Sequence, residues 1–109
     1  MKARKKILGE EILQEIIRRI VKVAKPEKII LFGSAAKGEM GPDSDLDLLV
    51  IKSCKNRRAT ARAIRRKLIG IGIAKDVIVA TPQDIERYKD SIGLIYQPAL
   101  TEGKVIYAA

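Results

Sequence analysis

The chain of 109 residues carries 22 Lys and Arg against 13 Asp and Glu, a net charge of +9, and 47% of its residues are apolar. This length predicts one small domain over residues 1–109, and the apolar content excludes a disordered chain. Histidine is absent and Cys54 is the single cysteine, which excludes His-dependent catalytic triads, His-ligated zinc, thiolate metal clusters and internal disulfides.

No apolar run approaches the roughly 20 residues that a membrane span needs, and no apolar signal-peptide core follows the basic residues 1–6. We therefore expect a cytoplasmic protein that does not enter the membrane. The basic balance favours anionic partners such as nucleotides, RNA or an acidic protein, although a basic surface without a ligand is equally compatible with the charge alone.

The first half of the chain predicts a helix, a strand, a short helical turn and a second strand. Residues 4–25 carry an apolar stripe at helical spacing, and Pro26 ends this helix. The apolar residues 28–32 predict a buried strand. Gly33 and Ser34 then open a short helical turn that Gly38 closes, and residues 39–44 form a loop. Residues 45–52 predict the second strand.

In the second half, Asn56 predicts the N-cap of a helix that runs to about residue 69, with Ala59, Ala63, Ile64 and Leu68 on its inner side. Residues 75–80 predict a third strand. Thr81 and Pro82 predict the start of a short helix, residues 92–102 look helical, and residues 104–107 predict a last strand. This order predicts an α/β (α+β) fold, with a small mixed sheet of about four strands flanked by helices.

The most informative stretch is residues 33–47, which links a small-residue turn to two carboxylates. Gly33 and Ser34 follow one apolar strand, whereas Asp45 and Asp47 open the next. Because strand side chains alternate between faces, both carboxylates point the same way and repel each other unless a cation lies between them. A divalent metal that also binds phosphate oxygens is the usual solution.

Two other motifs fit this stretch poorly. A Walker A loop needs Lys and then Ser or Thr after the second glycine, where this chain has Glu39 and Met40. A calcium loop that starts at Asp43 needs Gly and Glu where this chain has Leu48 and Cys54.

The remaining pattern is Gly-Ser followed, after ten residues, by Asp-x-Asp. It resembles the motif of the minimal nucleotidyltransferase family in the DNA polymerase β superfamily. In that family, Gly-Ser ends the first strand, two aspartates begin the second, and a third aspartate lies on a later strand. This sequence offers Asp76 as the third, in Lys-Asp-Val-Ile-Val. The closing residues 102–107 also look like the family's usual end, so the resemblance covers nearly the whole chain and implies the polymerase β-like nucleotidyltransferase fold.

The resemblance implies transfer of a nucleoside monophosphate, AMP from ATP, to an acceptor hydroxyl. Asp45, Asp47 and Asp76 would be the catalytic and metal-binding residues for two Mg²⁺ ions, with Mn²⁺ as a substitute. Gly33, Ser34 and Lys37 would bind the phosphates. The family commonly has arginine where Lys37 stands, which keeps the charge but not the planar donor fork.

Small members of this family are often paired with a helical HEPN-type protein, which implies the antitoxin of a toxin–antitoxin pair whose acceptor is the partner protein. A non-catalytic antitoxin-like module with the same fold and a basic RNA-binding domain are the alternatives, and homo-oligomer formation stays open. The second helix carries a basic run that is either a solvated face or a surface for RNA or an acidic partner: Lys55, Arg57, Arg58, Arg62, Arg65, Arg66 and Lys67.

Overall fold

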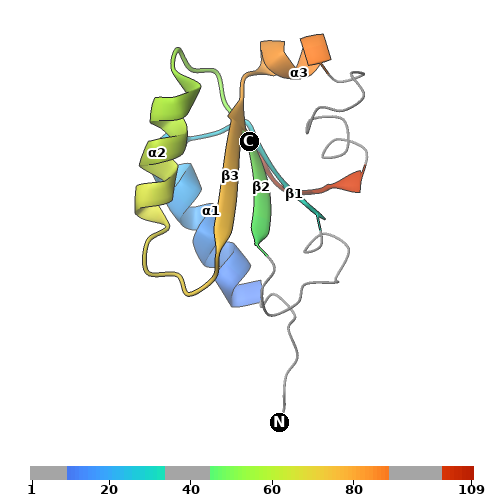
Figure 1. Ribbon diagram of the computed structural model, residues 1–109. Coiled ribbons are helices and arrows are strands. Elements are labelled where there is room, and N and C mark those ends of the chain that lie inside the picture. The colour runs from blue at the N-terminus through green and yellow to red at the C-terminus, as the bar shows by residue number, and fades with distance from the viewer. Residues whose placement is uncertain (1–9, 34–44, 89–101) are drawn as a thin grey trace.

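The computed structural model of the protein describes residues 10–33, 45–88 and 102–109 (Figure 1). The expected turn at residues 34–38, the start of the first expected helix and residues 92–101 of the last one lie outside the described residues. Seven elements follow in chain order: α1 (Glu10–Ala24), β1 (Lys28–Phe32), β2 (Leu46–Ile51), α2 (Arg57–Lys67), β3 (Lys75–Ala80), α3 (Pro82–Tyr88) and β4 (Lys104–Ala108).

The strands form one mixed sheet in the order β3-β2-β1-β4. Strand β1 pairs antiparallel with both β2 and β4, whereas β2 pairs parallel with β3. The parallel pair is joined through α2, as a parallel connection requires a crossover. The predicted four-stranded mixed sheet with helices is therefore confirmed, and its central strands β1 and β2 are buried on both faces, as their continuous apolar sequences suggest.

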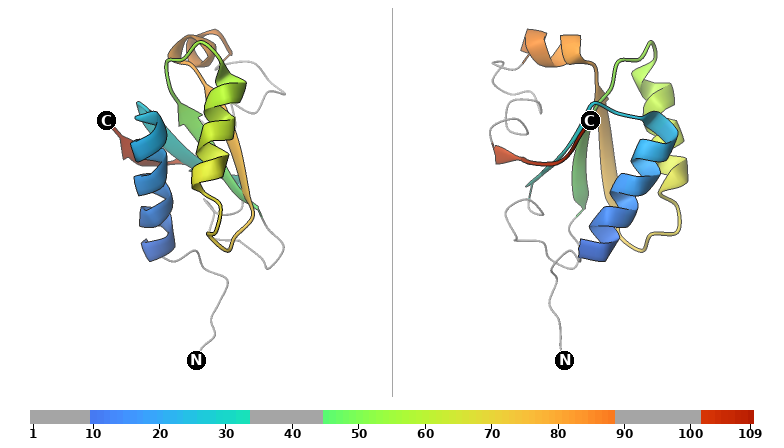
Figure 2. Two further views of the ribbon diagram at one scale, coloured as in Figure 1. Left: turned by 90° about the vertical axis from the view of Figure 1, so that its left-hand side faces the viewer. Right: turned by 180° about the vertical axis from the view of Figure 1, so that it is seen from behind.

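Helices α1 and α2 pack side by side on one face of the sheet (Figures 1 and 2). Alternate strand residues form the main core with them, including Leu31, Leu48 and Val77, together with Ile16 and Ile64 from the helices. The other face carries a smaller apolar cluster against which α3 packs through Ile85: Ile30, Phe32, Leu49, Ile51 and Ala80.

Local signals explain where the helices begin and end. Helix α1 ends as Lys25 takes a left-handed conformation, with φ of 47°, before the buried Pro26. Asn56 caps α2 as predicted, since its side-chain oxygen accepts a hydrogen bond from the Ala59 N–H at 3.0 Å. At α3, the hydroxyl of Thr81 accepts a hydrogen bond from the Asp84 N–H at 3.0 Å, which confirms the predicted N-cap.

The inner side of α2 differs from the prediction. Ile64 and Leu68 are buried as expected, but Ala61 is buried with them, whereas Ala59 is exposed and Ala63 is half-buried. Residues 61, 64 and 68 lie at spacings of three and four, which is the true inner stripe of this helix. The prediction was wrong at Ala59 because alanine occurs on both sides of α2 and carries a weak hydrophobic signal.

None of the helices in the described part of the chain is long and apolar enough to cross a membrane.

Candidate active site at one end of the sheet

Three chain segments that are distant in sequence meet at one end of the sheet. Because β1 and β2 are antiparallel, the end of β1 lies beside the start of β2; because β2 and β3 are parallel, the start of β3 lies there as well. The register pairs Phe32 with Asp47 across one ladder and Asp47 with Asp76 across the other. Gly33 comes directly after Phe32. The sheet therefore brings Gly33, Asp47 and Asp76 together at this end.

The carboxylates lie on the face away from α1 and α2. Residues that pair directly across two strands point to the same face, so Asp47 and Asp76 share the face of Phe32. Asp45 precedes Asp47 by two residues and is exposed. Asp47 is half-buried, and Asp76 is exposed. All three acids predicted from the sequence thus stand at the same end of the sheet, and their catalytic role stays a prediction.

Asp47 is in the least favourable setting for a negative charge. Burial is the largest cause that raises its pKa above the ordinary carboxyl value, and the charges of Asp76 and Asp45 raise the pKa further. Asp45 and Asp76 are thus close enough to Asp47 for their charges to oppose the ionisation of its carboxyl group. A cation or a proton at this end of the sheet would relieve this repulsion.

Gly33 has two reasons to be glycine. Its φ of 75° lies in the left-handed region, which side chains other than glycine rarely adopt. A Cβ atom at this position would collide with the Asp47 carboxylate, meeting Oδ2 and lying 3.3 Å from Cγ. The turn after β1 therefore passes directly against the carboxylate of Asp47, and only a residue without a side chain permits this approach.

The chemistry of the donor set fits a hard divalent cation. Carboxylate oxygens are the ligands that Mg²⁺ and Mn²⁺ prefer, and the described residues contain no histidine and only one thiol. Among residues 10–33, 45–88 and 102–109, however, no three such side chains are grouped closely enough to form a ready metal site. Asp47 and Asp76 thus share a face, and the charges of Asp45 and Asp76 act on Asp47, without a closed cage among the described residues. The predicted phosphate contacts Ser34 and Lys37 lie outside the described residues.

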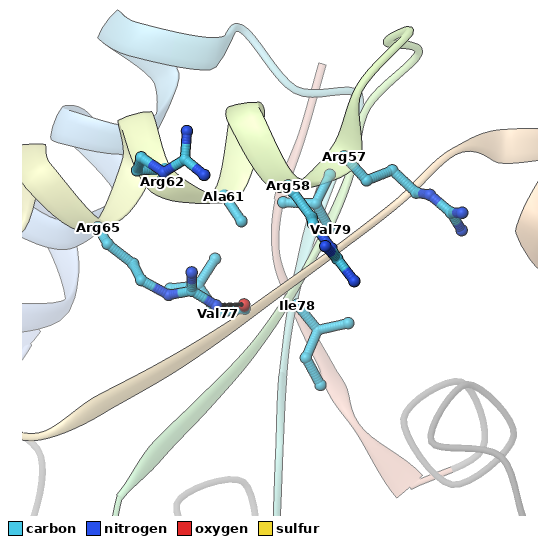
Figure 3. Close-up of a pocket in the computed structure, with 8 residues that line it drawn as sticks. All are labelled: Arg57, Arg58, Ala61, Arg62, Arg65, Val77, Ile78 and Val79. Atoms are coloured by element: carbon cyan, nitrogen blue, oxygen red, sulfur yellow. Dashed lines mark hydrogen bonds between the residues drawn. The ribbon is translucent and has the colours of Figure 1, made fainter.

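The sequence did not predict a second feature, a hollow of about 520 Å³ between α2 and β3. Four arginines of the basic run line it together with Ala61 and residues 77–79 (Figure 3). The signal in the sequence was the spacing of Arg58, Arg62 and Arg65, which places them on one side of a helix. The sequence does not show what lies opposite these arginines, because only the fold places the edge strand β3 beside this side of α2.

Comparison with known proteins gives a family match and several structures of the same fold. The family model described as "Nucleotidyltransferase domain" matches residues 10–100, which is most of the chain. None of the curated proteins matches the sequence.

Three solved structures share the fold at low sequence identity. A mutant of the toxin–antitoxin MntA–HpeT has a TM-score of 0.64 and 16% identity, over 94% of this chain and 75% of that one. A toxin–antitoxin structure with AMP-PNP has a TM-score of 0.65 and 18% identity, with the same coverage. A putative nucleotidyltransferase from Sulfolobus solfataricus has a TM-score of 0.61 and 19% identity, over 90% and 78% of the two chains. At such identities these structures establish the shared fold.

Proposed function

The chain belongs to the nucleotidyltransferase domain family, and on this premise we propose that it transfers AMP from ATP to a hydroxyl group of a partner protein. The observation that carries the proposal is the register that pairs Asp47 with Asp76 next to Gly33. Two similar folds come from toxin–antitoxin structures, one of them with AMP-PNP. These neighbours support an adenine nucleotide as the donor and a toxin as the partner, with this chain as the antitoxin; a HEPN-type toxin is what the family resemblance implies.

The reaction forms a bond between the acceptor oxygen and the α-phosphorus and breaks the bond from that phosphorus to pyrophosphate. Asp45, Asp47 and Asp76 would hold two Mg²⁺ or Mn²⁺ ions, which supply neutralisation of the phosphate oxygens and of the departing pyrophosphate. An exposed carboxylate oxygen of Asp76 would accept the proton of the attacking hydroxyl.

The phosphates would be held at the turn that follows β1. Gly33 has no side chain, so its backbone is open to close approach by an anion, and the predicted contacts Ser34 and Lys37 follow it in sequence. The turn lies against the Asp47 carboxylate, so a triphosphate bound there would lie next to the acidic cluster. Positioning and charge neutralisation are the main contributions that phosphoryl transfer needs from a protein.

Substitution of Asp45→Asn together with Asp47→Asn tests the proposal. We expect this variant to lose label transfer from radioactive ATP to a HEPN-type partner, and to lose Mg-dependent pyrophosphate release, while its circular dichroism spectrum is unchanged. Direct Mn²⁺ binding, measured by electron paramagnetic resonance, should weaken in parallel. Glu10→Gln with Glu11→Gln is the matched control, because it removes the same charge from exposed positions of α1.

The second candidate is a non-catalytic antitoxin module, and the open spacing of the acids in the described residues favours it. The same variant distinguishes the two. The catalytic proposal is contradicted if the unmodified chain transfers no label to the partner and the Asp45/Asp47 variant still neutralises it. That result would support inhibition by contact.

A further inference from the structure

The hollow between α2 and β3 is lined by arginines on one side and by an apolar strand on the other. Figure 3 shows Arg58 and Arg65 extending from α2 toward β3, whereas Arg62 lies beside the helix and Arg57 points away from the other three arginines. Ile78 of β3 also borders the hollow, but its half-buried side chain points to the other side of the strand, toward the face of the sheet away from α2 (Figure 3). Strand β3 is at the edge of the four-stranded sheet, so this hollow lies along an edge that no other strand in residues 10–33, 45–88 and 102–109 covers.

Two of the four arginines already have partners. Arg57 pairs with Asp84 at 2.8 Å, and Arg65 donates a hydrogen bond to the Val77 carbonyl oxygen at 3.0 Å. In the part of the chain that the structure describes, Arg58 and Arg62 make no hydrogen bond or ion pair. They are exposed and lie four residues apart, one turn along α2. The hollow therefore presents two available guanidinium groups.

These arginines do not help α2 to form. The first turn of α2 contains no acidic residue, and Arg57 and Arg58 stand there instead, although the positive end of a helix dipole disfavours cations. Arg58 and Arg62 also repel each other at a spacing of four residues. An anion that bridges both side chains would relieve this repulsion, and guanidinium groups bind carboxylates through paired hydrogen bonds.

The lining favours a polypeptide over a nucleic acid. None of the described residues that line the hollow is aromatic, so bases would find no stacking platform among them. Phosphates would engage the arginines but leave the apolar strand side uncovered. A segment that alternates acidic and apolar side chains would satisfy both sides. Because Arg65 occupies the Val77 carbonyl, such a segment would bind through its side chains and not as a continuous added strand.

The position of the hollow connects it with the acidic end of the sheet. Ile78 follows Asp76 by two residues on β3, so the two side chains share one face. We propose that the hollow binds an acidic segment of the acceptor protein, with carboxylates on Arg58 and Arg62 and apolar side chains that cross the edge of β3 to Ile78. The identity of the occupant as the acceptor rests on the proposed function. A segment bound there lies along the strand that carries Asp76 and directs a neighbouring hydroxyl toward it.

A labelled peptide that alternates glutamate and valine is the probe, and fluorescence anisotropy with the full chain is the measurement. We expect Arg58→Glu with Arg62→Glu to weaken binding by about tenfold or more, since two attractive contacts become repulsive. Arg66→Glu with Lys67→Glu is the matched control, because it changes the same charge on the same helix outside the hollow. It should change binding by no more than about twofold through long-range attraction. A peptide with glutamine in place of glutamate should bind weakly to the unmodified chain.

Equal weakening by both double variants would overturn the proposal, because the peptide would then sense only net charge. Tighter binding of duplex or single-stranded RNA than of the peptide at about 0.15 M salt, lost in the Arg58/Arg62 variant, would also overturn it and assign the hollow to nucleic acid. The Asp45/Asp47 variant should still bind the peptide, and the Arg58/Arg62 variant should still bind a fluorescent ATP analogue with Mg²⁺. Failure of catalysis and failure of docking are thus measured separately.

Discussion

The side chain of Asp47 is held where its own charge is opposed. Its neighbours at the end of the sheet are Asp45 and Asp76, and its carboxylate is partly removed from water. Nothing in the described residues compensates with a positive charge, since the causes that act on its pKa all raise it. Phe32, its partner on β1, is buried and apolar. An arrangement that disfavours an ionised carboxylate is expected at a site that binds a cation, and it costs stability when no cation is bound.

We therefore expect Asp47→Asn to stabilise the fold at neutral pH. Because its pKa is raised, the folded chain binds a proton at Asp47 more tightly than the unfolded chain does. The contribution of Asp47 to the free energy of unfolding then falls as pH rises through the interval between the ordinary and the raised pKa, and stays reduced above it. Thermal unfolding followed by circular dichroism, without divalent metal, should show a higher Tm for the variant at pH 7.

The same experiment at acid pH separates this effect from others. The gain in Tm should shrink as the pH falls below the ordinary carboxyl range, because Asp47 is then protonated in both states. Glu11→Gln, at an exposed position of α1, should show no such pH-dependent gain. A loss of stability at pH 7 in the Asp47 variant would mean that the carboxylate supports the fold instead.

At the scale of elements, helix α2 depends on contacts at its two ends. Asn56 caps its N-terminus, while Arg19 of α1 donates hydrogen bonds to the carbonyl oxygens of Lys67 and Ile69 at 3.0 and 3.2 Å at its C-terminus. These contacts satisfy backbone groups that a helix leaves unpaired at its ends. They offset the two arginines in its first turn, whose charge opposes the helix dipole.

Replacing the cap should measure this dependence. Asn56→Ala removes the acceptor of the Ala59 N–H and should lower the free energy of unfolding by about 1 kcal/mol, within a range of roughly 0.5–2. Urea denaturation gives the value. Asn56→Asp keeps an acceptor and adds a negative charge at the positive end of the helix, so it should be at least as stable as the original chain. If the alanine variant is as stable as the aspartate variant, α2 is held by packing alone.

Local sequence signals were sufficient to predict those strand bounds and helix caps that depend only on neighbouring residues. Strands 28–32 and 75–80 were predicted with the bounds that the structure has, and the caps at Asn56 and Thr81 were read from single residues. Alternation along the expected strand 45–52 predicted Asp45 and Asp47 on one face, but β2 begins at Leu46, so only Asp47 lies within the strand and the face of Asp45 stays a prediction. The inner side of α2 was predicted less well. Alanines occur on more than one side of this basic helix, so the sequence alone does not decide which side faces the sheet.

At the scale of the whole molecule, strand pairing decides the site, and the sequence does not encode it locally. Residues 47 and 76 are opposite each other because β2 and β3 are parallel neighbours in this register, and many other pairings of apolar strands would bury similar surface. Only the resemblance to a family indicated Asp76 beforehand. The hollow at β3 was invisible for the same reason, since it depends on which strand is left at the edge.

The charge balance is also a property of the whole chain, and it predicts how salt acts on stability. Glu15 pairs with Arg18 and Arg19, and Arg57 with Asp84, but these pairs cannot offset a net charge of +9. Like charges held together in a compact fold repel one another. Raising NaCl shortens the screening length from about 30 Å at 0.01 M to about 8 Å at 0.15 M. We therefore expect Tm to rise over this interval.

Thermal unfolding by circular dichroism at the two salt concentrations measures the effect, and a rise of roughly 4–8 °C would correspond to about 1 kcal/mol for a chain of this size. The Arg66→Glu with Lys67→Glu variant should show a smaller rise, since each substitution removes two units of positive charge from the balance. A Tm that falls with salt would mean that attractive ion pairs outweigh the repulsion. The same screening should weaken binding of the acidic peptide to Arg58 and Arg62, so stability and docking should respond to salt in opposite directions.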